Sequence, residues 1–120
     1  MMEQESFDKG LKKAKQKDYA GAIEEFTEAL QANPEFIEAY YQRGLAYYDL
    51  GKIPQAVFDY DEVLKRDSYN IEAYYCRALA RLALKNLPGA LKDVDKTIEL
   101  NCYKAGAYNL RGVIERKLGN

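Results

Sequence analysis

The sequence repeats itself with a period of 34 residues. Residues 38–51 read EAYYQRGLAYYDLG, and residues 72–85 read EAYYCRALARLALK. Self-similarity at a fixed period of this length is typical of arrays in which each copy is a small unit stacked on the next, and it limits the possible folds more than any local motif does. The period divides the chain into blocks 3–36, 37–70 and 71–104, followed by residues 105–120.

Each block contains two stretches with helical spacing of apolar residues. Tyr19, Ala22 and Phe26, for example, recur at positions i, i+3 and i+7 of one helix face. Pro54 and Pro88 fit the first turn of a helix, where a missing N–H group costs little. No alternating pattern of a β-strand competes, so the chain is predicted to be all-α. The predicted helices span about 4–16, 20–32, 38–50, 54–66, 72–84, 88–100 and 106–118.

Several positions carry the same kind of residue in successive blocks. We number the positions of each block as slots 1 to 34 and extend the numbering to residues 105–120. A small residue on the first helix of a block, facing an alanine on the second, lets two antiparallel helices approach closely. The recurring residues are Gly10, Gly44, Ala78 and Gly112 at slot 8, Ala22, Ala56 and Ala90 at slot 20, Phe26, Tyr60 and Val94 at slot 24, and Tyr40, Tyr74 and Tyr108 at slot 4.

This pattern resembles the tetratricopeptide repeat (TPR), which combines a small residue at slot 8 with alanine at slot 20, an aromatic residue at slot 24 and often proline at slot 32. Pro34 occupies slot 32 of the first block, whereas Ser68 and Cys102 replace it in the next two. The resemblance implies a single domain over residues 1–120, folded as a right-handed α-α superhelix with a concave groove. It also implies a scaffold or protein-binding module that is not an enzyme.

The groove of such a repeat is lined mainly by the first helix of each block. Slots 5, 6, 9, 12 and 13 lie opposite the packing edge of slots 4, 8 and 11, and they are unusually apolar and rich in tyrosine. Asp8, Asp49 and Glu72 are expected at the rim, which favours a partner with apolar anchors and some basic residues. The predicted partner-binding residues are Phe7, Leu11, Tyr41, Gln42, Leu45, Tyr48, Tyr75, Cys76, Leu79 and Leu82.

Some grooves of this family hold the C-terminal carboxylate of heat-shock chaperones with Lys, Arg and Asn side chains at five slots. None of the residues at these slots here carries the positive charge that would pair with a carboxylate. We therefore expect a protein or peptide partner that is not a chaperone C-terminal carboxylate. The residues at the five slots are Phe7, Leu11, Gln42, Glu72 and Cys76.

The amino-acid composition limits the kinds of site that the chain can form. The chain has no histidine, so the most frequent general base and the commonest metal ligand are missing, and no cofactor or metal is expected. Cys76 and Cys102 are too few for a disulfide framework, and residues 1–10 resemble no signal peptide, so a cytoplasmic location is expected. No stretch is long and apolar enough for a membrane span.

Two alternatives remain open at this point. The apolar groove or the C-terminal helix, residues 105–120, could join copies of the chain into a homo-oligomeric scaffold. The Lys-rich run of residues 11–17, LKKAKQK, could make the chain a nucleic-acid adaptor. Nucleic acid is nevertheless not expected as the partner, because the net charge is −1 and no aromatic base-stacking platform accompanies the lysines.

A ladder of ion pairs is also predicted. Arginine recurs at slot 7 and an acid recurs at slot 23, so each acid is expected to reach the arginine of its own block or of the following one. Such pairs would fix the angle between blocks. The residues are Arg43, Arg77 and Arg111 at slot 7, and Glu25, Asp59 and Asp93 at slot 23.

Overall fold

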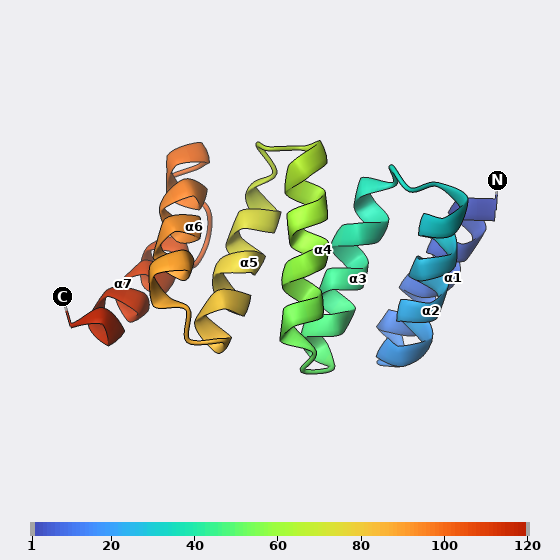
Figure 1. Ribbon diagram of the computed structural model, residues 1–120, viewed down its shortest axis with the longest axis horizontal. Helices are drawn as coiled ribbons and strands as arrows, with labels where there is room; N and C mark the ends of the chain where they lie inside the picture. Colours follow the sequence, from blue (N-terminus) through green and yellow to red (C-terminus); the bar gives the residue numbers. More distant parts are fainter. Residues whose placement is uncertain (1, 120) are drawn as a thin grey trace.

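A computed structural model describes residues 2–119, which form seven helices and no strand (Figure 1). The prediction of an all-α chain is confirmed, and every helix boundary lies within two residues of the predicted one. The helices are α1 (Met2–Lys15), α2 (Tyr19–Ala32), α3 (Ile37–Asp49), α4 (Ile53–Arg66), α5 (Ile71–Ala83), α6 (Leu87–Leu100) and α7 (Ala107–Leu118).

The helices form an elongated row from the N-terminus to the C-terminus (Figure 1). The array measures 49 × 25 × 21 Å, and its radius of gyration is 14.8 Å, against about 13.6 Å for a compact domain of this length. Each helix packs against its neighbours in sequence. The odd-numbered helices also touch one another in the order α1, α3, α5 and α7, whereas the even-numbered helices of residues 2–119 do not. The odd-numbered side is therefore the inner, concave side.

The turn between the two helices of a block has the same geometry along the array. Slot 15 adopts left-handed backbone angles, with φ of 64° at Lys17, 81° at Gly51 and 64° at Lys85. This left-handed residue ends the first helix in the manner of a C-terminal cap. The following slot starts the second helix, where the Asp18 and Asn86 side chains accept hydrogen bonds from the backbone N–H groups at the start of α2 and α6.

Small residues at slot 8 allow the close approach of the two helices in a block, but their nearest neighbour is not the predicted alanine. A Cβ atom added at Gly10 would lie 2.5 Å from the Phe26 ring, and one added at Gly44 would lie 2.6 Å from the Tyr60 ring. Both rings are buried. The aromatic side chain at slot 24 thus occupies the space that a side chain at slot 8 would fill.

Candidate functional site

Three hollows lie along the concave side, each where the odd-numbered helices of two successive blocks meet. The first, between α1 and α3, has a volume of about 410 Å³. The second lies between α3 and α5, has a volume of about 60 Å³, and has the Tyr60 ring in its wall. The third lies between the end of α5, the start of α6 and α7, with a volume of about 470 Å³. The hollows therefore recur once per block along one face.

Most of the predicted groove residues line these hollows. Leu11 is 37% exposed in the first, and Leu45, which is half-buried, lines both the first and the second. Leu45 also belongs to none of the buried clusters of the core. Its side chain is thus available to a ligand, although a binding role for these residues stays a prediction. The other predicted residues at the hollows are Gln42, Tyr48, Cys76, Leu79 and Leu82.

The aromatic residues at slot 5 pack against other side chains of the array, Phe7 against rings of its own block and Tyr41 against the next block. Phe7 is buried, and its ring centroid lies 4.8 Å from that of Phe36 and 5.7 Å from that of Phe26. The Tyr41 hydroxyl lies 3.8 Å from Cys76 Sγ on the next block. Burial, together with the nearby Cys76 thiol, raises the pKa of Tyr41. At Tyr41, slot 5 therefore faces the following block as well as the groove.

Tyr75 follows the same rule at the last junction. Its hydroxyl lies so close to Gly106 that a Cβ atom at that glycine would be 2.6 Å from the oxygen, and Lys104 Nζ lies 5.0 Å from its ring centroid. Lys104 is also paired with Glu72 at 2.9 Å. Tyr75 thus packs against the segment that leads into α7. The sequence held a signal for this packing, because slot 5 is aromatic in all three blocks, as Phe7, Tyr41 and Tyr75. Stacked blocks need apolar side chains at recurring positions to pack on one another.

The hollows are lined by both acidic and basic side chains, whereas acidic residues were predicted at the rim. Lys15 lines the first hollow together with Asp49, which also borders the second. Lys85 and Lys117 line the third hollow. The Cys76 thiol, by contrast, has its pKa raised by burial, so it is protonated at neutral pH and adds apolar surface to the groove.

The predicted ion-pair ladder is present in the second and third blocks. Arg43 donates two hydrogen bonds to the Asp59 carboxylate, at 2.9 and 2.7 Å, and a third to the Thr27 hydroxyl at 3.1 Å. Asp59 is fully buried. Arg43 on α3 is thus joined to α4 of its own block and to α2 of the preceding one.

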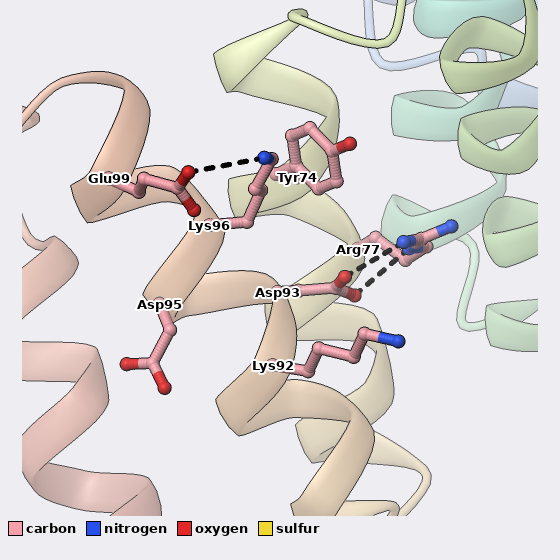
Figure 2. Close-up of a pocket in the computed structure, with 7 residues that line it drawn as sticks. All are labelled: Tyr74, Arg77, Lys92, Asp93, Asp95, Lys96 and Glu99. Carbon is pink, nitrogen blue, oxygen red and sulfur yellow. Dashed lines mark hydrogen bonds and ion pairs between the residues drawn. The ribbon is translucent and has the colours of Figure 1, made fainter.

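Arg77 repeats this arrangement one block later. It donates two hydrogen bonds to Asp93, at 2.9 and 2.8 Å, and one to Asp61 at 2.7 Å. The pair lies at the wall of a polar cavity of about 530 Å³. In Figure 2, Asp95, which is on α6 with Asp93, points away from Arg77. Slot 25, occupied by Thr27, Asp61 and Asp95, is the second partner position that the sequence analysis missed.

The ladder differs from the prediction at both ends. Glu25 pairs with Lys13 at 3.2 Å, and slot 7 of the first block holds Lys9 where the other blocks have arginine. Arg111 lies 3.6 Å from Asp95 and 4.0 Å from Glu115, so it makes only loose ion pairs. The prediction that Glu25 pairs with an arginine at slot 7, and that Arg111 pairs with an acid at slot 23, is therefore wrong.

Residues 2–119 contain no group of three or more His, Cys, Asp or Glu residues placed to hold a metal ion. Among the same residues, none of the helices has the length and apolar character required to cross a membrane. The lysines of α1 are not all free, since Lys13 is engaged by Glu25.

Comparison with known proteins assigns the family. A profile described as TPR repeat matches residues 10–51, and one described as Tetratricopeptide repeat matches residues 37–70. The first TPR domain of human RPAP3 is 30% identical, with a TM-score of 0.91 over 98% of this chain and 93% of that one. The chain belongs to the tetratricopeptide repeat family. No curated protein sequence matches it.

Two further TPR structures are similar to this TPR chain. The first TPR of Spaghetti (RPAP3), bound to the HSP90 peptide SRMEEVD, is 29% identical, with a TM-score of 0.95 over 99% of this chain and 94% of that one. The second TPR domain of human RPAP3, in complex with the HSP70 peptide SGPTIEEVD, is 24% identical, with a TM-score of 0.87 over 92% of each chain. The superhelical fold implied by the sequence pattern is therefore confirmed.

These structures overturn one deduction made from the sequence. The exclusion of a chaperone C-terminal carboxylate as partner is wrong, because TPR domains of closely similar structure are bound to chaperone peptides that end in EEVD. The deduction considered only five slots. Lys15 lines the same hollow as Leu11 and Gln42, so a cation is present at this face after all.

Proposed function

We propose that this chain is a protein–protein interaction module that binds an extended peptide segment along its concave side. The observation that carries the proposal is the recurrence of one hollow at each junction between blocks, the first two of which have leucines at slot 9 in their walls. Tetratricopeptide repeats are interaction modules in general, and the peptide-bound relatives support this class of function. An extended peptide presents alternate side chains to one side, so it can place apolar side chains into successive hollows.

The charges around the hollows define the ligand more closely. Lys15, Lys85 and Lys117 stand near apolar surface, and Asp49 lies between the first two hollows. A ligand with acidic residues beside a small apolar one matches the lysines and the second hollow, whose volume of about 60 Å³ suits a short side chain. The peptide SRMEEVD has this composition, and it is bound by a relative that is 29% identical. An acidic peptide of this kind is therefore our proposed ligand class.

Isothermal titration with SRMEEVD, and with its C-terminal amide, tests the proposal. Leu45→Asp should weaken binding by more than about tenfold, because it places a charge in the wall of two hollows and removes an apolar contact. Phe58→Asp is the matched control, since Phe58 lies on α4, outside the hollows, and is 57% exposed. Its affinity should equal that of the wild type.

Two outcomes would contradict the proposal. Equal affinity of the Leu45 variant, with unchanged circular dichroism, would remove the concave hollows from the binding site. Failure of the wild type to bind either peptide would reject the acidic ligand class. A large difference between the acid and the amide would show that the terminal carboxylate itself is recognised.

A further inference from the structure

The outward face of α7 repeats a surface that is covered everywhere else in the array. Ala107, Leu110 and Ile114 bury one side of α7 in the core cluster shared with α5 and α6. The opposite side carries slots 4, 7, 8 and 11. In α1, α3 and α5 these slots face the second helix of the same block. In α7 they are Tyr108, Arg111, Gly112 and Glu115.

Gly112 leaves open a space that is filled in the first two blocks. A Cβ atom at Gly10 or Gly44 would collide with the Phe26 or Tyr60 ring. At Gly112 the nearest atom among the described residues is Arg116 Nη1, at 3.5 Å. The ring position over this glycine is therefore unoccupied by any part of residues 2–119. Tyr108 beside it is 52% exposed.

Arg111 lacks the contact that defines its equivalents. Arg43 and Arg77 each donate two hydrogen bonds to an aspartate at slot 23, immediately before the bulky residue at slot 24. Within the described residues, Arg111 has only Asp95 at 3.6 Å and Glu115 at 4.0 Å. Asp95 is at slot 25, the same slot as Asp61, which pairs with Arg77 from the preceding block. The side of the guanidinium that would take the acid at slot 23 is thus available, and the Arg111 side chain is 35% exposed.

We propose that this face of α7 is a docking site for an amphipathic helix of a partner protein that carries the pattern Ala-x-x-Asp/Glu-aromatic. The acid would pair with Arg111, and the aromatic ring would lie over Gly112. The pattern is that of the chain's own second helices, AIEEF at 22–26 and AVFDY at 56–60, which meet the same surface in their own blocks. Charge complementarity at Arg111 and the ring-sized space at Gly112 select this partner independently of the concave groove.

Glu115 tunes this docking site. At the same slot, Arg81 Nη1 lies 2.9 Å from Asp93, and Lys13 lies 3.2 Å from Glu25, so this slot adjoins the acid at slot 23. Glu115 would repel an incoming carboxylate. Glu115→Gln should therefore bind the acidic helix more tightly than the wild type does.

The test uses a capped synthetic peptide with the sequence of α4, IPQAVFDYDEVLKR, titrated into the ¹⁵N-labelled chain and followed by NMR. Because a free helix of 14 residues is only marginally stable in water, the titration extends to millimolar peptide. Amide shifts are expected at Tyr108, Arg111 and Gly112 and not at Leu11 or Leu45. Replacing the tyrosine of the Asp-Tyr pair by alanine should weaken binding by more than about tenfold.

Variants of the chain separate docking from folding. Gly112→Leu fills the ring space and should abolish binding, while it raises the helix propensity of α7. Lys117→Leu adds the same side chain to the other side of α7 and should leave binding unchanged. Replacing the peptide aspartate before tyrosine by asparagine should weaken binding to the wild type but not to Arg111→Gln, as a double-mutant cycle requires.

Four results would overturn the proposal. Three of them are shifts confined to the concave residues, undiminished binding by a folded Gly112→Leu variant, and no shift at the highest peptide concentration. A wild-type dimer that Gly112→Leu converts to a monomer would also overturn it, because the face would then belong to a second copy of the chain. The Leu45→Asp variant should lose binding of SRMEEVD on the concave side but still bind the α4 peptide on α7. The two proposals can therefore be rejected independently of each other.

Discussion

Asp59 is a carboxylate with no exposed surface, and it is held by an arginine whose side chain is 13% exposed. Burial raises the pKa of Asp59 even though Arg43 donates two short hydrogen bonds to it. Loss of hydration therefore offsets much of the attraction within the pair, as is common for buried ion pairs. The contribution of Arg43 and Asp59 is to orient α3 against α4, and through Thr27 against α2 as well.

Removing one member of this pair should be far more damaging than removing both. We expect Asp59→Ala to lower the free energy of unfolding by about 3–5 kcal/mol, because it leaves Arg43 buried without its counter-ion. The double variant Arg43→Met/Asp59→Leu should lie close to the wild type. Urea denaturation followed by circular dichroism measures both.

Asp95 provides the control for this prediction. Its carboxylate is 52% exposed and lies 3.6 Å from Arg111, so Asp95→Ala should change the free energy of unfolding by less than about 0.5 kcal/mol. Equal losses for Asp59→Ala and Asp95→Ala would show that burial does not determine the value of these pairs.

At the scale of a helix pair, slots 8 and 24 compensate for each other in size. Gly10 and Gly44 face the large rings of Phe26 and Tyr60. The third block has the larger Ala78 at slot 8 and the smaller Val94 at slot 24, both fully buried. Each pair of helices is thus closely packed, with a small residue at slot 8 and a large ring at slot 24 in the first two blocks, and two residues of intermediate size in the third.

This compensation can be tested by transferring the residues of one block to another. Gly44→Ala should destabilise the chain by about 1–3 kcal/mol through overpacking against the buried Tyr60 ring. Tyr60→Val should cost less in the Gly44→Ala background than in the wild type. Gly112→Ala is the control, because its Cβ has room, and it should gain up to about 1 kcal/mol from helix propensity. A loss at Gly112 equal to that at Gly44 would contradict the role assigned to the rings.

The helices were predictable to within two residues because the same local signals occur in every block. The ends of the ladder were not, since a cation at slot 11 also reaches the acid at slot 23, as Lys13 does for Glu25 and Arg81 for Asp93, and only the packing of the two helices shows this. The binding role of Tyr41 was hard to judge for another reason. Slot 5 lies on the border between groove and next block, and only the stacking of blocks decides how much of the ring remains free.

At the scale of the whole molecule, stability is distributed along a line. Each helix packs on its neighbours in sequence, and among residues 2–119 the only further contacts between helices join successive odd-numbered helices. The buried residues accordingly fall into three clusters along the row. Arrays of this kind have a stability that is close to a sum over units and their interfaces.

Amide hydrogen exchange should therefore vary along the chain. We expect the strongest protection in α3, α4 and α5, which have helices on both sides, and weaker protection in α1 and α7. Exchange measured by NMR would show this gradient. Uniform protection from end to end would mean that the array opens only as a whole.

The absence of contacts between the even-numbered helices of residues 2–119 has a mechanical consequence. A tension that pulls the ends of the array apart meets no direct resistance between one even-numbered helix and the next. It acts first on the junctions α2–α3, α4–α5 and α6–α7. The chain should then extend in separate small steps, one for each junction. The α2–α3 junction, which Arg43 and Thr27 join by a hydrogen bond, should separate after the α6–α7 junction, where Arg111 is only loosely paired.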